Sequence, residues 1–278
     1  RATLLFDGAM SHARVYVNGE EVGYWPYGYN AFYFDITDQL KVGEVNELAV
    51  RLENETDSSR WYPGAGLYRN VHLIITNDVH IDMWGVQVTT PEILSDRATI
   101  RVKTNFVLPP GKELGNCGVS VDILDADGKM VYGTSSLPDV FATSHFTQEI
   151  VLYNYKLWTL ENPYLYTALV RIYDTGDKYD ECYVRFGIRS IEIRPEEGFF
   201  LNGVETKFKG VCNHHDLGPL GAAVNEAAIR RQIRLLKDMG CNAIRTSHNM
   251  PAPELVEACD EMGMMLMLES FDEWRTPK

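Results

Sequence analysis

Three short polar stretches of the sequence carry the side chains best suited to chemistry. They are NHHDLG at 213–218, RTSHN at 245–249 and ESFDEW at 269–274. Each stretch comes at the end of an apolar segment that has the pattern of a β-strand. Histidine, arginine and carboxylate groups in such stretches could ligate a metal, activate a nucleophile or bind a polar ligand.

A polar ligand fits these stretches better than a metal or a serine nucleophile does. No HxH or HExxH spacing is present, and Arg245 would repel a cation, so no metal site is predicted. Ser247 lacks the GxSxG turn that exposes a nucleophilic serine. A polyol, in contrast, needs charged and neutral hydrogen-bonding groups on a rigid rim, with an aromatic side chain such as Trp274 as a floor.

The segments around these stretches alternate between strand and helix patterns. Strands are expected at 207–212, 241–248 and 264–271. Between them, 225–240 and 251–263 have the features of helices, and each ends at a glycine. This order predicts parallel β/α units, whose strands present functional groups at their carboxyl ends. We therefore expect the polar stretches to share one rim of a barrel that three strands only begin, because three strands leave unpaired sheet edges.

The first two thirds of the chain has the pattern of β-structure throughout. Turn signals separate short alternating strands, and Asn18-Gly19 and Asp127-Gly128 favour tight hairpins. The expected strand segments are 14–25, 31–37, 46–54, 69–76, 80–90, 98–108, 118–132, 145–152, 164–174 and 184–193. They form two blocks with the spacing of antiparallel sandwiches, and the second block suits an immunoglobulin-like module.

Composition narrows the classes of partner. The net charge of −13 argues against nucleic acid or an anionic membrane surface as the main partner. No apolar run approaches the roughly 18 residues of a membrane-spanning helix. The five cysteines have an odd count and no CxxC spacing, which predicts neither a disulfide framework nor structural zinc. The chain opens with neither an initiator methionine nor a leader, so we expect an internal start, and no compartment is predicted.

Four stretches resemble the glycoside hydrolase family 2 enzymes, and among them the β-galactosidases. SSRWYPGAGLYRNVHL resembles the end of the family's sugar-binding sandwich, and FKGVCNHHDLGPLG, CNAIRTSHNMPAPELVEACDEMGM and LMLESFDEW resemble the start of its barrel. Together with the strand pattern, the resemblance implies a multidomain protein. Its expected parts are a jelly-roll sugar-binding β-sandwich at 1–77 that is incomplete at its N-terminus, an immunoglobulin-like β-sandwich at 78–194 and the N-terminal part of a (β/α)8 TIM barrel at 195–278.

Carried over to this sequence, the resemblance implies a sugar site on the barrel rim. The expected substrate-binding residues are His214, His248, Asn249, Glu269 and Arg60. Arg245 would hold the nucleophilic carboxylate ionised through a charge-assisted hydrogen bond. His215 and Asp216 would brace their loop or contact neighbouring barrel loops.

The resemblance does not supply a cofactor. Some members hold a magnesium ion with a carboxylate and a histidine two residues later. Here Glu273 is followed by Trp274 and Arg275, so that site is not supported and no cofactor is predicted.

The pair of carboxylic acids that a retaining glycosidase needs is not expected within this chain. In the family, the acid/base glutamate follows an asparagine after the fourth strand, and the nucleophile ends the seventh strand, both beyond Lys278. The Asn-Glu pairs that are present, at 46–47, 54–55 and 225–226, lie elsewhere. We therefore expect a parent enzyme that cleaves terminal β-D-galactosides with retention, and a chain that is inactive alone.

Three alternatives stay open. β-Glucuronidase and β-mannosidase belong to the same family, and groups that receive a glucuronide carboxylate would come from later parts of the barrel. The SHN and ESFDEW segments favour β-galactosidase over both. A non-catalytic carbohydrate-binding protein is the alternative from another class, but it has no need of three polar barrel stretches. A homo-oligomeric parent also stays open.

Overall fold

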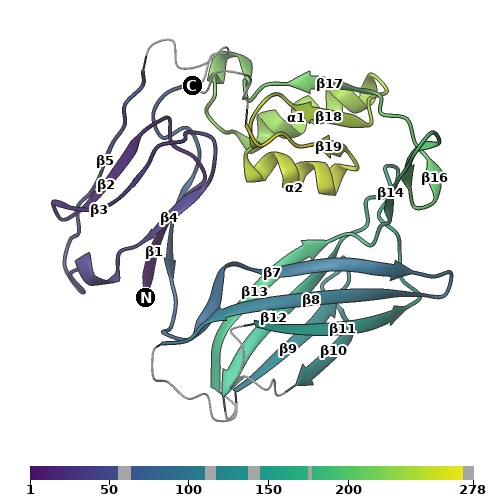
Figure 1. Ribbon diagram of the computed structural model, residues 1–278, viewed down its shortest axis with the longest axis horizontal. Coiled ribbons are helices and arrows are strands. Elements are labelled where there is room, and N and C mark those ends of the chain that lie inside the picture. Colours follow the sequence, from purple (N-terminus) through teal and green to yellow (C-terminus); the bar gives the residue numbers. More distant parts are fainter. Residues whose placement is uncertain (56–63, 110–116, 137–144, 175–176, 272–278) are drawn as a thin grey trace. The chain divides into compact units, whose positions relative to one another are not determined.

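The computed structural model describes residues 1–55, 64–109, 117–136, 145–174 and 177–271. The chain divides into two compact units, one formed by residues 1–75 with 208–278 and the other by residues 76–207. Strands dominate both units, and the helices α1 and α2 lie beside the last strands of the chain (Figure 1). No helix in the described ranges is long and apolar enough to cross a membrane.

The first unit begins with a sandwich of two antiparallel sheets, of strand order β4-β1-β6 and β3-β2-β5. The bounds are β1 Ala2–Phe6, β2 Ala13–Val17, β3 Glu20–Trp25, β4 Phe32–Asp35, the 3₁₀ helix η1 Thr37–Gln39, β5 Leu48–Arg51 and β6 Val71–Ile75. Every second residue of the two central strands is buried, so each turns one face toward a core that contains Phe6, Val15 and Phe32.

The turn residues in the sequence predict one hairpin of this sandwich correctly, but they give no indication of the strand β1. The predicted hairpin at Asn18-Gly19 is confirmed, because Val17 pairs with Glu20 and φ is +52° at Asn18 and +86° at Gly19. The strand β1, however, is absent from the sequence prediction although it is the centre of its sheet. Its partners β4 and β6 come later in the chain, and no turn signal joins β1 to either of them.

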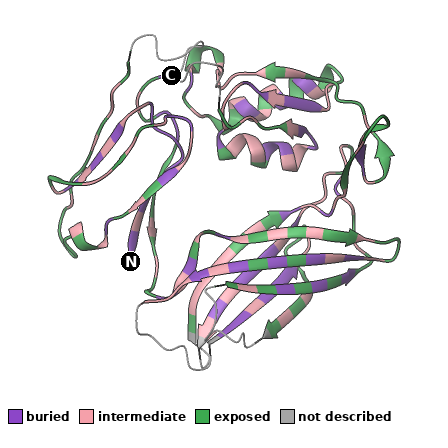
Figure 2. Cartoon of the chain, viewed as in Figure 1, coloured by how far each residue is buried: buried purple, intermediate pink, exposed green. Residues whose placement is uncertain are grey.

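The second unit contains the predicted immunoglobulin-like sandwich, with sheets of order β10-β9-β12-β13 and β11-β8-β7. The bounds are β7 His80–Ile93, β8 Arg97–Val107, β9 Cys117–Leu124, β10 Met130–Ser136, β11 His145–Tyr153, β12 Tyr166–Asp174 and β13 Asp177–Phe186. Buried and exposed residues alternate along β8, as the bands in Figure 2 show. The buried positions of the two sheets, among them Ile100, Ile123 and Ile150, form one core.

In this unit one predicted hairpin is confirmed and one predicted strand segment needs correction. Residues 118–132 form the hairpin β9–β10, as Asp127-Gly128 predicts, and Gly128 lies in its turn at a φ of +78°. The segment 184–193 is wrong as a single strand, because β13 ends at Phe186. A separate meander follows, made of β14 Ile191–Arg194, β15 Gly198–Leu201 and β16 Val204–Glu205. The strand β13 ends because the backbone changes partner: the Ile188 carbonyl accepts a 2.9 Å hydrogen bond from the Trp158 amide. Gly187 lies so close to Trp158 that a Cβ there would be 2.6 Å from the Trp158 Cβ.

The last part of the first unit consists of parallel β/α units, as predicted. Its sheet has the order β17-β18-β19. The bounds are β17 Gly210–Asn213, the 3₁₀ helix η2 Gly218–Leu220, α1 Glu226–Asp238, β18 Ala243–Thr246, α2 Pro253–Met262 and β19 Met265–Met267. Asn225 caps α1 by accepting a 2.9 Å hydrogen bond from the Ala228 amide, and Gly263 ends α2 at a φ of +69°. The helices pack against one face of the sheet, around Ile233 and Ile244.

Candidate functional site

The three parallel strands end at the same edge, where the chain continues with polar residues. The backbone register pairs Asn213 with Thr246 and Arg245 with Met267. Beyond the strands, the Ser247 amide donates a 2.9 Å hydrogen bond to the Asn213 carbonyl. The Glu269 amide donates a 3.1 Å hydrogen bond to the Thr246 hydroxyl. These bonds hold the three strand ends together, so the polar stretches share one rim.

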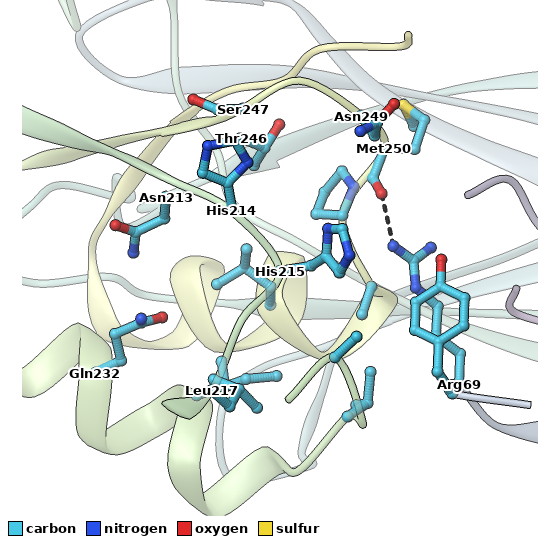
Figure 3. A pocket seen from close by; sticks show the side chains of 17 residues that line it. Arg69, Asn213, His214, His215, Leu217, Gln232, Thr246, Ser247, Asn249 and Met250 are labelled. Atoms are coloured by element: carbon cyan, nitrogen blue, oxygen red, sulfur yellow. Dashed lines mark hydrogen bonds between the residues drawn. The ribbon is translucent and has the colours of Figure 1, made fainter. Parts of the chain in front are cut away.

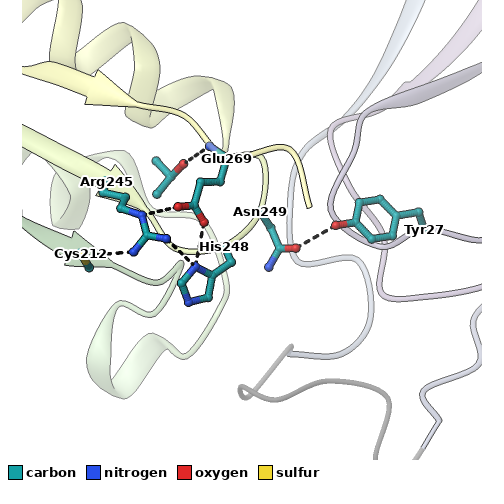
Figure 4. A network of polar contacts seen from close by, with 7 residues as sticks. Tyr27, Cys212, Arg245, His248, Asn249 and Glu269 are labelled. Carbon is teal, nitrogen blue, oxygen red and sulfur yellow. Dashed lines mark hydrogen bonds and ion pairs between the residues drawn. The ribbon is translucent and has the colours of Figure 1, made fainter. Parts of the chain in front are cut away.

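Glu269 is the centre of the polar network on this rim (Figure 4). Arg245 donates from Nε to Glu269 Oε1, and His248 Nδ1 lies 2.7 Å from Glu269 Oε2. Because an ionised carboxylate only accepts, the second contact requires a proton on His248 Nδ1, and the 3.3 Å approach of Arg245 Nη2 to the same nitrogen is then not a hydrogen bond. Each oxygen of this half-buried carboxylate therefore has a charged or polar donor, which fixes its orientation.

Arg245 lies on the face of the sheet that the helices leave open. In β17, Val211 packs against the helices while Cys212 points the opposite way. Arg245 Nη1 donates to the Cys212 sulfur at 3.6 Å. The contacts with Cys212 and with Glu269 raise the pKa of Arg245 above its ordinary value, so the side chain is a permanent cation.

The loop after β17 uses its three ionisable residues in different ways. The His214 ring lies edge-on to the His248 ring, with centroids 5.6 Å apart. The His215 ring packs instead against the aromatic rings of Tyr29 and Tyr68 from the first sandwich, with centroids 5.2 and 5.9 Å away. Asp216 accepts a 2.7 Å hydrogen bond from the Gly218 amide and so closes its own loop. Of these three residues, only His214 contacts the Glu269 network.

The surroundings of His214 lower the pKa of its imidazole ring. Burial, and then the proximity of His248, lower the pKa of His214 below its ordinary value of 6.5. The folded chain thus binds this proton less readily than the unfolded chain. The stability that depends on neutral His214 is complete above about pH 6.5 and is lost as the pH falls below that value.

Nuclear magnetic resonance of the histidine rings from pH 5 to 8 measures this pKa directly, with His214→Gln to assign the signal. In His248→Gln the pKa of His214 is expected to rise toward 6.5, because a neighbouring charge is removed. A His214 ring that titrates at or above 6.5 in the unaltered chain contradicts the prediction.

Asn249 has a partner in the first sandwich rather than in the Glu269 network. The Tyr27 hydroxyl donates a 2.8 Å hydrogen bond to the Asn249 side-chain oxygen (Figure 4). This bond leaves the Asn249 amide nitrogen as the group that could donate to a ligand. Tyr27 was not anticipated from the sequence, because nothing near it in the chain indicates a contact with the β/α part.

The structure thus brings together four of the six predicted site residues, namely His214, Arg245, His248 and Glu269. Asn249 lies next to them on the same loop. Arg60 lies outside the described residues, as do Glu273 and Trp274. Cys212 was also missed as a member of this group, although the alternation of β17 could have placed it on the same face as Arg245.

A cavity of about 50 Å³ lies behind the rim, between the loop after β17 and the loop after β18 (Figure 3). Leu217, Ala222, Val224, Ile229 and Leu255 contribute apolar side chains to its wall. Its volume suits a few water molecules, and its wall is mostly apolar. The polar network, which faces the open side of the sheet, is therefore the better candidate for binding and chemistry.

Comparisons of the chain with protein families and with known proteins agree on one family. The description "Glycosyl hydrolases family 2" matches residues 79–189, and "Glycosyl hydrolases family 2, TIM barrel domain" matches residues 191–273. The chain is 43% identical to the β-galactosidase BoGH2A of Bacteroides ovatus, over 98% of this chain and 32% of that protein. It is 29% identical to a β-glucuronidase of Bacteroides fragilis, over 97% of this chain and 40% of that protein.

A solved structure agrees with this assignment. The crystal structure of a family 2 glycosyl hydrolase from Bacteroides cellulosilyticus matches with a TM-score of 0.96 and 38% identity, over 100% of this chain and 36% of that one. The chain therefore spans about a third of the length of such proteins. Two matching descriptions of one family, a relative at 43% identity and a shared fold over the whole chain lead to one conclusion: the chain belongs to glycosyl hydrolase family 2.

Proposed function

We propose that this chain forms part of a retaining β-glycosidase that cleaves terminal β-D-galactosides. The observation that carries the proposal is the Arg245–Glu269–His248 network on the rim of the first three β/α units. A family 2 glycosidase has to present such groups where a barrel binds its substrate. The 43% identity to a β-galactosidase over 98% of the chain supports the galactoside.

In this proposal the rim residues hold the sugar and its reaction partner. His214 and His248 donate to or accept from the sugar hydroxyls, as do Asn249 and Glu269. Glu269 has lone pairs left beyond its contacts with Arg245 and His248, since each carboxylate oxygen accepts more than one hydrogen bond. Arg245 lies on the open face of the sheet, and its positive charge keeps the carboxylate that attacks the sugar in its ionised form.

The reaction would be a double displacement. A carboxylic acid protonates the glycosidic oxygen while a carboxylate attacks the anomeric carbon, which forms a glycosyl-enzyme ester and releases the aglycone alcohol. Water, deprotonated by the first group, then attacks the same carbon, breaks the ester bond and restores both carboxyl groups. Both steps invert the anomeric carbon, so the overall configuration is retained.

We assign neither carboxyl group of that pair to this chain. Retaining enzymes hold the two groups about 5 Å apart and free to react. Glu269 is bound by Arg245 and His248, and Asp216 is bound within its own loop. The pair is therefore expected in later strands of the barrel.

A β-glucuronidase is the second candidate, supported by the 29% identity to the Bacteroides fragilis enzyme. The two candidates differ in one requirement, since a glucuronide brings a carboxylate that needs a cation. In this proposal Arg245 already serves two carboxylates, that of Glu269 and the one that attacks the sugar. A glucuronidase would thus need a further cation from another part of the protein.

Release of nitrophenol from the β-galactoside, β-glucuronide and β-mannoside tests the proposal. Two samples are compared, the 278-residue chain and a longer chain extended through the complete barrel. We expect the longer chain to prefer the galactoside by at least about tenfold in kcat/KM, and the shorter chain to be silent. A preference for the glucuronide would replace the substrate assignment. Turnover by the shorter chain would show that a carboxylate pair lies within these residues.

A further inference from the structure

We propose that Arg69, in the first sandwich, is a positioning residue for the loop that carries His248 and Asn249. It touches neither the network on the rim nor the site of the reaction, and it acts through the backbone of Met250. Its effect on catalysis rests on the proposed glycosidase function. Its effect on the geometry of the loop does not.

The Arg69 guanidinium links three separate segments of the chain, and Figure 3 shows its bond to Met250. Nη2 donates a 2.7 Å hydrogen bond to the Met250 carbonyl, in the loop between β18 and α2. Nη1 donates to two carbonyls of the sandwich, that of Tyr29 at 2.7 Å and that of Asp7 at 3.2 Å. One planar group thus ties the loop to two segments of the sandwich at once.

The loop between β18 and α2 is anchored through its backbone on both sides of His248 and Asn249. On one side, the Ser247 amide bonds to the Asn213 carbonyl of the neighbouring strand end. On the other side, the Met250 carbonyl accepts from Arg69. His248 and Asn249 lie between these two anchors. If Arg69 releases Met250, the loop loses its backbone anchor on the α2 side, and the side-chain contacts of His248 and Asn249 are left to hold that end.

The cost of burying Arg69 indicates that the contact is selected for geometry. The residue is only 6% exposed, and burial lowers the pKa of its guanidinium. Its hydrogen-bond partners in the described part of the chain are carbonyl oxygens rather than carboxylates. A buried cation without a bonded anion contributes little to stability, and an apolar side chain of similar volume would pack at lower cost. Only a guanidinium, however, can donate to carbonyls in these directions at the same time.

The neighbours of Arg69 extend this attachment to the helices. The Tyr68 carbonyl accepts a 3.0 Å hydrogen bond from the Val224 amide, just before α1. Asn70 donates from its side chain to Glu254 in the first turn of α2. Arg69 is the member of this trio that bonds to the backbone of the loop itself, so its role is separable from theirs.

Arg69→Lys in the longer chain with the complete barrel tests the proposal. Lysine keeps the charge but loses the fork that joins Met250 to the sandwich. We expect kcat/KM toward the preferred nitrophenyl glycoside to fall by about 10- to 100-fold, as small displacements of binding groups commonly do. Gly8→Ala is the second variant. A Cβ there would lie 2.9 Å from Arg69 Cδ, so it displaces the side chain without removing it, and we expect a smaller loss.

The histidine ring signals of the 278-residue chain give a readout that a purely structural role would not change. We expect the His248 signal to shift or broaden in Arg69→Lys. Arg171→Lys, which alters an ion pair with Asp122 in the other unit, should leave both the signal and kcat/KM unchanged.

Arg69→Lys and Gly8→Ala variants that lose thermal stability but keep kcat/KM and the His248 signal overturn the inference. If the unaltered longer chain cleaves no β-glycoside, the proposed function fails, and the His248 signal alone decides the role of Arg69.

Discussion

Replacement of Arg245 by methionine is expected to lower kcat/KM by about 100- to 1,000-fold in the longer chain that contains the complete barrel. Methionine has a similar length and no charge, so it preserves packing and removes the cation. In the structure that cation contacts the carboxylate of Glu269 and the sulfur of Cys212, and its Nη2 lies 3.3 Å from His248 Nδ1. The substitution therefore alters the network at its centre.

The size of the effect follows from the position of Arg245. Its side chain points to the face of the sheet that the helices do not cover, where the interior of a complete barrel lies. Charges in such an interior interact more strongly than charges at a wet surface. Without Arg245, Glu269 keeps His248 as a donor but loses its cation, and an attacking carboxylate would lose the charge that keeps it ionised.

Matched variants separate charge from packing. Arg245→Lys keeps the charge without the fork and should retain more activity than Arg245→Met. Arg230→Met removes an arginine that pairs with Glu226 and Glu261 on the helices, and kcat/KM should stay within about twofold. If Arg245→Met stays within tenfold of the unaltered enzyme, the proposed role of Arg245 is wrong.

The parts of the fold that local chemistry determines could be predicted from the sequence. The hairpin at Asn18-Gly19 needs left-handed backbone at two successive residues, and this dipeptide tolerates it. The helix α1 has a cap at Asn225 and apolar residues at helical spacing, so its boundaries are correct within two residues. Both features depend on residues within a few positions of one another.

The missed elements depend on partners that are distant in the sequence. The strand β1 is defined by β4 and β6 on either side of it. The meander β14–β16 follows a break at Gly187, next to which the Ile188 carbonyl bonds to the amide of Trp158, a residue far earlier in the chain. No local pattern marks either feature.

The residues of the candidate site also fall into those that the sequence predicts and those that it does not. Arg245, His248 and Glu269 were predicted together, since parallel strands bring their carboxyl ends to one edge. Tyr27 and Arg69 were not, although they hold the same loop, because their contacts cross from the first sandwich to the β/α part. Sequence patterns thus identify the groups that could bind a ligand more readily than those that hold them in place.

Trp158→Ala is expected to destabilise the unit formed by residues 76–207 by about 3–5 kcal/mol. The side chain is 1% exposed, and the Arg189 guanidinium lies over its ring at 4.6 Å from the centroid. Its backbone is equally engaged, since the amide donates to the Ile188 carbonyl at 2.9 Å and its carbonyl accepts from Asn202 at 3.0 Å. Asn202 lies between β15 and β16, so Trp158 joins the sandwich to the meander.

Alanine would leave a cavity that the surrounding strands cannot close, because Gly187 has no side chain with which to fill it. Hydrogen exchange of the amides in β8 and β12, in the whole chain, reports this unit separately from the other. The protection of these amides against exchange should fall by about two to four orders of magnitude, at 1.4 kcal/mol for each tenfold change. Trp84→Ala, at a tryptophan that is 63% exposed, should change protection by no more than about threefold. Equal losses in the two variants would show that the buried Trp158 ring stabilises this unit no more than an exposed tryptophan ring does.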